Sequence, residues 1–440
     1  MAFRARIQYD LTQQPRLLQQ LPTSLIELLR LALQSHRHAL KLGPQNADVI
    51  LLGNISTQLR THRRLMVSSN TAQVLTSVAE LISEGNVSNT NKQESLQLLQ
   101  EALGLFQRCL VLQESQYTKA EDETRLMTAI VIEDQEQPLS VADSTSDGAG
   151  QEQWASIVEP VTKSNLLDTV LAQVQTLTDM CGLVANETTG RLPWIEELSR
   201  DIVQDKLASY ATASDRTSEA SMVRANFMCA YVDASFRVGG IDLPTYEREV
   251  DNAFSIPGLA NSPQGLCDRA DALVALCSSV RATVKHAELQ EVDADQPNKI
   301  QWKALSRALS DLKAASTLPD AQNLARIHLR RGDCELLRCR LGETPTSYEP
   351  SRSNAAMLLK NAEVYYRGAA GAALADRSQS EEFEARLKES AVSTLMGDAR
   401  KLSALVNAAN EKALLVMEEM RDEGLIADQF FQSVRNEAFQ

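Results

Sequence analysis

A regular spacing of small residues on one helix face, closed by a proline, constrains the fold of this chain more than any other feature. It lies in and just before the segment Ser35–Val49, with offsets of four, three and five residues: Ala32, His36, Ala39 and Pro44. Residues three and four apart lie on one face of an α-helix. Small side chains on that face let a second helix approach closely, and a proline cannot continue a helix. The spacing therefore predicts a closely packed pair of helices with a turn at the proline.

The same offsets of four and three recur twice further along the chain. The two sets are Ala102, Phe106 and Cys109, and then Ala308, Leu312 and Ala315. The second set is followed by Pro319, one residue early, and then by a segment of helical pattern that carries Gly332. Recurrence of one helix-pair pattern is typical of chains that stack similar units along one direction.

These patterns resemble the tetratricopeptide (TPR) repeat, in which two antiparallel helices, A and B, form each unit. The resemblance is clear over residues 1–115, weak over 300–440, and limited to helical pattern between them; His36 stands where the family usually has an aromatic residue. It implies an all-α fold, a right-handed superhelix of antiparallel helix pairs (a TPR-like α-solenoid). In such a superhelix the A helices line a groove and the B helices lie on the convex side.

Composition also favours helix almost throughout the chain. Alanine, leucine, glutamine and glutamate dominate, and the 440 residues include only 18 glycines and 13 prolines. These frequent residues have high helix propensity, whereas glycine and proline interrupt helices. The best strand candidate, residues 128–132, is short and isolated.

The sequence divides into three parts. Residues 1–115 are predicted to form N-terminal TPR-like helices, residues 116–153 an acidic, flexible linker, and residues 154–440 a second TPR-like solenoid. Residues 50–69 interrupt the first part, because removing them restores the repeat phase at a helix that starts with Asn70. We consider two hypotheses for this segment. It is either an insertion, lineage-specific or retained from non-coding sequence, or an ordinary helix with a basic face.

The predicted linker is acidic and rich in serine, with little helical periodicity. Low hydrophobicity combined with net charge is typical of solvated, flexible chain. A second interpretation is an acidic strap that screens or competes for a basic ligand. The residues that would form the strap are Glu121, Asp122, Glu123, Glu133, Asp134 and Glu136.

The net charge of −14 restricts the partners of this protein. A general nucleic-acid binder needs basic patches that neutralise phosphates, and the charge balance argues against that class. An acidic protein attracts basic partners, because opposite fields steer association. The charge is uneven, since residues 1–70 carry nine Lys and Arg against three Asp and Glu, whereas residues 71–160 carry four against fifteen.

No motif for catalysis or cofactor binding is present. The sequence lacks the phosphate-binding, dinucleotide-binding, nucleophile-elbow and zinc-protease patterns. The five histidines are dispersed, and the seven cysteines form no C-x-x-C pair. We therefore expect no enzyme activity, no metal, no cofactor and no small-molecule substrate. Scattered cysteines, with no secretory signal or membrane-length apolar run, favour a reducing compartment, the cytoplasm or the nucleus.

The TPR resemblance also implies which residues face the groove. These are polar residues of the predicted A helices: Asn70 and Gln73 in the restored phase, and, by weaker analogy, Asp168, Gln173, Tyr231, Asp333 and Glu335. The set is mixed polar and acidic, which suits a peptide that carries lysine or arginine. TPR proteins that hold the acidic C-termini of chaperones use spaced lysine, asparagine and arginine residues, and here only Asn70 matches.

The sequence therefore predicts a non-enzymatic, protein-binding adaptor or chaperone. Its groove and acidic linker would hold a protein or peptide partner, one that is basic. Two alternatives stay open within non-enzymatic functions: a structural scaffold subunit of a larger assembly, and a co-chaperone for acidic chaperone C-termini. An enzyme with a site that carries no recognisable motif is a further alternative. It predicts a deep pocket in which titratable groups converge.

Overall fold

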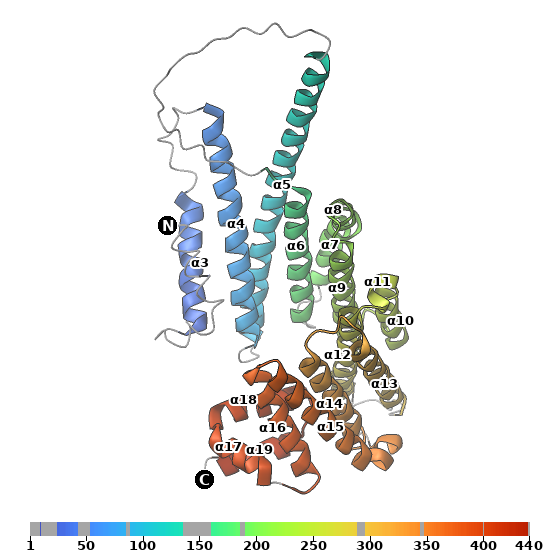
Figure 1. Ribbon diagram of the computed structural model, residues 1–440. Coiled ribbons are helices and arrows are strands. Elements are labelled where there is room, and N and C mark those ends of the chain that lie inside the picture. Colours follow the sequence, from blue (N-terminus) through green and yellow to red (C-terminus); the bar gives the residue numbers. More distant parts are fainter. Residues whose placement is uncertain are drawn as a thin grey trace. The chain divides into compact units, whose positions relative to one another are not determined.

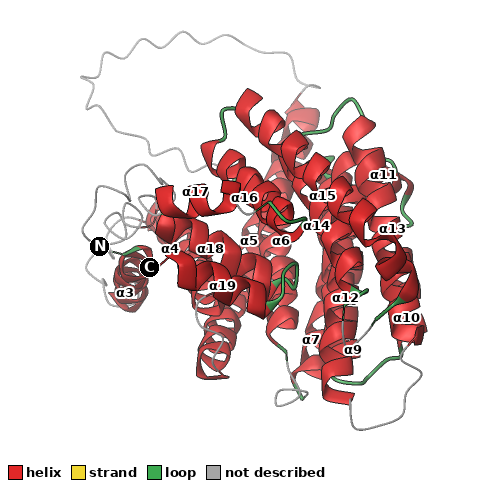
Figure 2. Ribbon diagram, turned by 90° about the horizontal axis from the view of Figure 1, so that it is seen from below, coloured by secondary structure: helices red, strands yellow, loops and turns green. Residues whose placement is uncertain are grey.

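The computed structural model describes residue 9 and residues 24–42, 53–84, 89–134, 160–184, 190–287, 295–343, 347–398 and 400–438. Within these ranges every regular element is a helix and none is a strand (Figure 2). Most helices pack against the helix that precedes or follows them in the chain. The predicted all-α class, with successive helices packed in antiparallel pairs, is confirmed. This is the construction of helical-repeat proteins.

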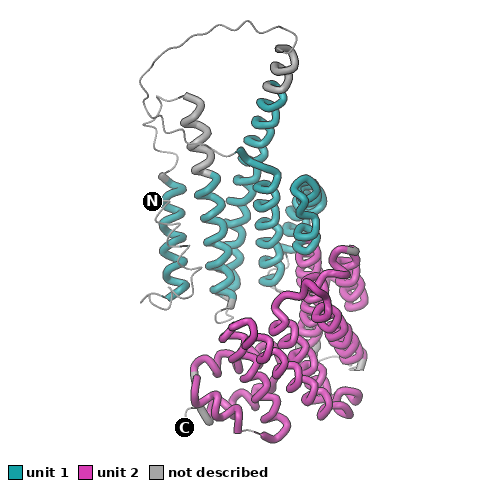
Figure 3. Tube along the Cα trace, in the orientation of Figure 1, with its two compact units in different colours: residues 1–184, 190–223 teal, residues 185–189, 224–440 magenta. Residues whose placement is uncertain are grey.

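The chain forms two compact units (Figure 3). Unit 1 comprises residues 1–184 and 190–223, and unit 2 comprises residues 185–189 and 224–440. The boundary between them falls within helix α9 (Thr217–Arg237), so that one helix begins in unit 1 and continues in unit 2. The predicted division at residues 116–153 instead falls inside unit 1.

Unit 1 begins with four long helices that lie side by side (Figure 1). They are α3 (Leu25–Leu42), α4 (Gly53–Glu84), α5 (Asn89–Asp134) and α6 (Lys163–Leu183). Of the small residues that defined the pattern in unit 1, Ala32 and Ala102 have no exposed surface and Cys109 is 1% exposed, whereas Ala39 is half-buried. Ala32 and Ala102 lie among the leucine, valine and phenylalanine side chains that join α3, α4 and α5 into one core.

Helix α4 corrects the prediction for residues 50–69. It starts at Gly53 and runs without interruption to Glu84, so no helix begins at Asn70. The sequence from 54 to 84 contains neither glycine nor proline, and nothing in it ends a helix. Leu65 is buried within α4, and its carbonyl oxygen accepts a hydrogen bond from the Cys109 thiol of α5 at 3.5 Å. Residues 53–69 are helical, as the second hypothesis predicted. That the segment arose as an insertion stays a hypothesis.

Helix α5 corrects the prediction of a flexible linker. It continues to Asp134, so residues 116–134, including the strand candidate at 128–132, are helical. Two hydrogen bonds from other helices hold α5 just before the predicted linker. The Thr169 hydroxyl donates to Gln113 Oε1 at 2.8 Å, and the Tyr210 hydroxyl donates to Glu114 Oε1 at 2.7 Å. These contacts anchor α5 before residue 116, and the helix then continues through the polar residues to Asp134. Residues 135–153 of the predicted linker lie outside the described residues.

Unit 1 closes with a helical run of mixed type. It consists of α7 (Arg191–Ser199), the π-helix η2 (Arg200–Lys206) and α8 (Leu207–Ser214), and all three parts pack on α6. Pro193 occupies the first turn of α7, where its missing N–H costs no hydrogen bond. Asp215 has a φ of 57° and ends the run in the left-handed conformation that commonly closes helices.

Unit 2 contains the remaining helices, of which α12 to α16 each pack on the next. After α9 they are α10 (Leu243–Ala253), α11 (Pro257–Ala260), α12 (Pro263–Ala287), α13 (Asp295–Thr317), α14 (Leu324–Arg340), α15 (Glu349–Ala375), α16 (Gln379–Leu395), α17 (Arg400–Ala408), α18 (Asn410–Asp422) and α19 (Asp428–Ala438). Gly397, with a φ of +103°, lies in the turn that ends α16 before α17 begins.

The last recurrence of the sequence pattern is confirmed in unit 2. Ala308 and Ala315 on α13 have no exposed surface. Gly332 on α14 faces the ring of Tyr366 on α15, and a Cβ atom there would lie 2.4 Å from Tyr366 Cε1. Glycine is therefore required at this position by a close approach between consecutive helices.

Candidate functional site

A cavity of about 400 Å³ lies in unit 2 and is lined by many charged side chains. Alternate helices α12, α14 and α16 supply its polar side chains, and the segment after α18 closes one side. We call this cavity the acidic groove. Its charged lining residues are Asp271, Arg326, Arg330, Asp333, Glu381, Glu384, Lys388 and Glu423, and its apolar lining includes Val274, Leu329 and Leu425.

Lys388 of α16 is the buried centre of the acidic groove. It is 4% exposed, and its Nζ atom lies 3.1 Å from Asp333 Oδ1, 3.3 Å from Asp333 Oδ2 and 3.1 Å from Glu384 Oε1. Burial alone would lower the pKa of this ammonium group, but Asp333, Glu384 and Glu423 raise it overall. Lys388 is therefore charged at neutral pH, since a buried ammonium group is tolerated only when opposite charges surround it.

Asp333 is held from two sides. The hydroxyl of Tyr366, a fully buried residue of α15, donates a hydrogen bond to Asp333 Oδ1 at 2.7 Å, while Lys388 approaches from α16. This contact explains the close approach at Gly332, because the Tyr366 ring must pass α14 for its hydroxyl to reach Asp333. Three consecutive helices are thereby joined through one carboxylate.

A second ion pair lies on the other side of the acidic groove. Arg330 Nη1 contacts Asp271 Oδ2 at 2.6 Å, joining α14 to α12. Burial raises the pKa of Asp271 to about 6, and Asp268 and Asp333 add to the rise while Arg330 and Arg326 oppose it. Burial also raises the pKa of Glu423, which Lys388 opposes. Both carboxylates therefore hold protons more tightly than they would in water, mainly because burial disfavours their charged forms.

The charge balance determines what the acidic groove can bind. Five carboxylates, from Asp271, Asp333, Glu381, Glu384 and Glu423, face three cationic side chains. Lys388 and Arg330 are already occupied by carboxylates within the groove. A cationic guest would relieve repulsion among the acidic groups, whereas an anionic guest would add to it.

The residues of unit 2 that were predicted to share one groove lie in different places in the structure. Asp333 lies in the acidic groove, as described above. Glu335 does not, since it is 4% exposed and accepts hydrogen bonds from Arg338 Nη1 at 2.9 Å and from Asn361 Nδ2 at 3.1 Å. Tyr231 on α9 is half-buried with its ring centroid 6.3 Å from that of Phe227, and it lines neither described cavity.

The predicted groove residues of unit 1 lie on α4 and α6. Asn70 is half-buried and Gln73 is exposed on α4. On α6, Asp168 is exposed and its Oδ1 atom lies 2.5 Å from Arg216 Nη1, whereas Gln173 is buried and lines a cavity. Within the described part of unit 1, the structure therefore does not gather these residues into one groove.

The residues of the predicted acidic strap fall partly on α5. Asp122 and Glu123 are exposed there, and Glu121 Oε1 accepts a hydrogen bond from the Tyr117 hydroxyl at 2.6 Å. Glu133 and Asp134 belong to the last turn of α5. Glu136 lies outside the described residues.

Sequence reasoning missed Asp271, Glu384, Lys388 and Glu423. The only signal was the position of Lys388 within the apolar pattern of α16, between Leu387 and Ala391, which are both fully buried. A lysine on a buried helix face indicates a carboxylate partner, but the spacing of the sequence does not say which one.

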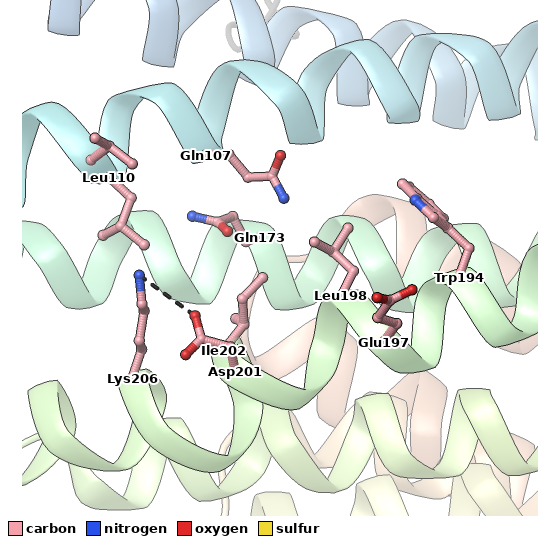
Figure 4. Close-up of a pocket in the computed structure, with 10 residues that line it drawn as sticks. Gln107, Leu110, Gln173, Trp194, Glu197, Leu198, Asp201, Ile202 and Lys206 are labelled. Carbon is pink, nitrogen blue, oxygen red and sulfur yellow. Dashed lines mark ion pairs between the residues drawn. The ribbon is translucent and has the colours of Figure 1, made fainter.

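A second cavity lies within unit 1 and has a volume of about 500 Å³ (Figure 4). Helices α5 and α6 form one part of its wall, and α7 and η2 form the other. We call it the Gln173 cavity. Its lining residues are Gln107, Leu110, Val111, Gln173, Trp194, Glu197, Leu198, Asp201, Ile202 and Lys206.

The described residues contain no group of three or more histidine, cysteine or acidic side chains arranged to hold a metal ion. All seven cysteines are in the thiol form, and six are buried. Burial raises the pKa of Cys109 and Cys267 to about 11 and that of Cys229 and Cys277 to about 12. These thiols are poor nucleophiles at neutral pH, because the reactive species is the thiolate. Over the same residues, none of the helices combines the length and the apolar character that crossing a bilayer requires.

No protein-family model matches this sequence, and no curated protein matches it. Among solved structures, the chain is similar to one described as "Circular tandem repeat protein with novel repeat topology and enhanced subunit contact surfaces". The two are 12% identical, the alignment covers 100% of this chain and 90% of that chain, and the TM-score is 0.33. A likeness of this size identifies neither a family nor a partner.

Proposed function

We propose that this protein is a non-enzymatic, TPR-like adaptor or chaperone that binds a basic protein or peptide in the acidic groove of unit 2. The excess of carboxylates in this enclosed groove carries the proposal. The net charge of −14 acts in the same direction, because it draws a basic partner toward the protein from a distance. The thiol state of the cysteines fits a cytoplasmic or nuclear setting.

The binding mode follows from the arrangement of fixed and available carboxylates. Asp333 is occupied by Lys388 and Tyr366, and it holds the walls of the groove in place. Glu384 is 33% exposed and Asp271 is 43% exposed, so each can accept a further hydrogen bond from a guest. A lysine or arginine side chain of the partner would place its charged end between them and its alkyl chain against Leu329 and Leu425.

The acidic surface of α5 would supply a weaker, second contact. Asp122 and Glu123 are exposed on this helix and attract basic segments without a shaped pocket. Exposed charge pairs contribute less than about 1 kcal/mol each and are screened by salt. We therefore assign specificity to the acidic groove and attraction at long range to α5.

The test compares short fluorescein-labelled peptides rich in lysine or arginine with glutamate-rich peptides of equal length, by fluorescence anisotropy at low and high salt. Basic peptides should bind, and the double variant Asp271→Asn/Glu423→Gln should weaken binding about tenfold, because it removes two groove charges. The matched control, Asp320→Asn/Glu411→Gln, removes two exposed charges outside the groove and should change little. Equal binding of basic and acidic peptides, or equal effects of the two variants, would refute the proposal.

A scaffold function is the second candidate, favoured by exposed apolar side chains on α15. Met357 is 54% exposed and Val364 is 50% exposed, and residues seven apart lie on one helix face. An assembly partner would cover this face without a strong dependence on salt. The third alternative, binding of acidic chaperone C-termini, is disfavoured by the negative balance of the acidic groove.

A further inference from the structure

The Gln173 cavity holds a polar group that the fold does not satisfy. Gln173 of α6 is 1% exposed. Among the described residues, neither its Nε2 nor its Oε1 atom meets a hydrogen-bonding partner. A buried amide without partners is unfavourable. An apolar residue of similar size, such as leucine, would fill the same space without this cost, so packing alone does not account for a glutamine here.

The surroundings of Gln173 are those of a small-molecule site. The cavity of about 500 Å³ is within the range of pockets that hold small organic ligands. Leu110, Leu198 and Ile202 provide apolar walls, and Trp194 is 36% exposed where α7 borders the cavity. Figure 4 shows the amides of Gln107 and Gln173 lying in the same space between α5, α6 and η2.

The single cationic side chain among the described residues of the cavity, Lys206, is already paired with carboxylates. Lys206 Nζ lies 3.0 Å from Glu114 Oε1 and 3.6 Å from Asp201 Oδ2. The Tyr210 hydroxyl also donates to Glu114, which fixes that carboxylate from a second side. Among the charged side chains of the described lining, only that of Glu197, beside Trp194, forms no ion pair. An anionic ligand would meet this carboxylate and find Lys206 already occupied, so the cavity disfavours an anion. The Gln173 amide pairs best with a neutral group that offers one donor and one acceptor.

The π-helix η2 shapes the wall opposite Gln173. Asp201, Ile202 and Lys206, all in η2, line the cavity. A π-helix is wider than an α-helix, and such segments often occur at functional sites. Here the wider turn directs Ile202 and Lys206 into the same cavity as Gln173.

From these features we propose that the Gln173 cavity binds a small, uncharged ligand that carries a carboxamide on a planar apolar body. A carboxamide presents one donor edge and one acceptor edge, and it can pair with the Gln173 amide through two hydrogen bonds. The planar body would lie between Leu198, Ile202 and the indole of Trp194. The terminal torsion of a glutamine side chain is soft, so the Gln173 amide can turn toward a ligand at little cost.

This proposal is separate from binding of a basic partner. Its residues belong to unit 1, whereas the acidic groove belongs to unit 2. Failure of one proposal does not affect the other, because the two involve different residues and different ligands, a basic peptide and an uncharged carboxamide.

The test uses benzamide and two probes of the same ring, N,N-dimethylbenzamide and benzoate, with the full chain. Binding is followed by saturation-transfer NMR of the ligand and by the indole N–H signal of Trp194 in protein labelled at tryptophan. A ligand of this size should bind with a dissociation constant of about 1 mM. N,N-dimethylbenzamide lacks the N–H donors and should bind at least about fivefold more weakly, since one of the two hydrogen bonds is lost. Benzoate should bind least well.

Two variants on α6 separate ligand pairing from general effects on the fold. Gln173→Leu should weaken benzamide binding at least about fivefold and remove the preference over N,N-dimethylbenzamide. Gln175→Leu is the matched control, because Gln175 is exposed on the same helix and hydrogen-bonds to Asp179 at 2.9 Å. It should leave binding unchanged.

The proposal is overturned if benzamide does not bind or does not shift the Trp194 signal. It is also overturned if the three probes bind equally, or if Gln173→Leu keeps the preference for benzamide. Stronger binding by N-acetylglutamine methylamide than by benzamide would overturn the small-molecule assignment and identify a peptide side chain as the source of the carboxamide.

Discussion

Replacement of Lys388 by methionine tests whether the acidic groove is held together by its buried charge. Lys388→Met keeps the length of the side chain and removes the ammonium group that meets Asp333 and Glu384 at 3.1 Å. Removing one partner of a buried ion pair costs about 3–5 kcal/mol, because the remaining charge is left uncompensated. Asp333 is 20% exposed and Glu384 is 33% exposed, so water offsets part of this cost. We therefore expect the free energy of unfolding to fall by about 3 kcal/mol, near the lower end of that range.

The assay is urea unfolding followed by fluorescence of Trp302, which lies in unit 2 with the guanidinium carbon of Arg338 4.0 Å from its ring centroid. Trp154 and Trp194 are replaced by phenylalanine so that unit 2 alone is reported. A loss of about 3 kcal/mol should lower the midpoint of this transition by about 1 M without changing its slope. Lys313→Met, at an exposed site on α13, should leave the midpoint within about 0.3 M of the parent.

A second substitution determines whether uncompensated charge is the cause. Adding Asp333→Asn to Lys388→Met removes the isolated carboxylate while the amide oxygen can still accept the Tyr366 hydrogen bond. The double variant should recover about 1–2 kcal/mol relative to Lys388→Met. If Lys388→Met behaves like Lys313→Met, or if Asp333→Asn brings no recovery, the reasoning is refuted.

Three further predictions concern close packing, pH and the buried amide. Gly332→Ala should lower the free energy of unfolding in urea by about 1–3 kcal/mol, because the added Cβ would clash with Tyr366. Gly371→Ala, where an added Cβ meets nothing within 4 Å, should raise it by about 0.5–1 kcal/mol. Equal effects of the two variants would contradict the packing argument. Affinity for a lysine-rich peptide should rise about threefold between pH 5 and pH 7, as Asp271 ionises through its raised pKa of about 6. In anisotropy titrations of Asp271→Asn the rise should be clearly smaller, since of the two acidic-groove carboxylates described above with a raised pKa only Glu423 remains. Without ligand, Asp271 should lower the free energy of unfolding as pH rises from about 4 to 6, because its raised pKa means that the folded chain binds this proton more tightly than the unfolded chain. A salt-bridged aspartate with a depressed pKa has the opposite effect. Gln173→Leu should raise stability by about 1 kcal/mol in thermal unfolding, because it removes an unsatisfied buried amide, and a loss would show that the amide is satisfied.

The helix class and the close-packing positions could be predicted because they depend on local spacing. Ala32, Ala102 and Ala308 each lie at a position that needs a small side chain so that a second helix can approach. Each is fully buried, as the spacing predicts. Gly332 belongs to the same class, since the ring of Tyr366 excludes any Cβ there. A repeat pattern predicts such positions well because each helix pair packs by the same geometry.

The boundaries of the first long helices could not be predicted in the same way. The polar residues from 116 onward predicted a linker, yet α5 continues to Asp134. Gln113 and Glu114, just before them, accept hydrogen bonds from Thr169 and Tyr210 that anchor this helix. Residues 53–69 likewise join α4 instead of interrupting it. Whether a polar helix persists depends on the neighbours it meets, and those neighbours lie 56 and 96 residues away in the chain.

The candidate sites were the least predictable part of the protein. The TPR resemblance placed Asp333 and Glu335 together in a groove, but two positions along a helix differ by about 200° in direction. Asp333 therefore faces Lys388, while Glu335 faces Asn361 on α15. Gln173 was expected in the same groove as Asp333, and it instead lines a separate cavity in unit 1.

The sequence by itself determined that this chain is helical, that certain small residues bring its helices close together, and that it carries a net charge of −14. Those properties arise from side-chain size, propensity and net charge, which act locally or sum over the chain. Only the tertiary structure decided that Asp271, Asp333, Glu384 and Lys388 share one groove and that the Gln173 amide faces a cavity. Such groupings depend on how far each helix runs and which face it turns to its neighbours, and long-range packing sets both.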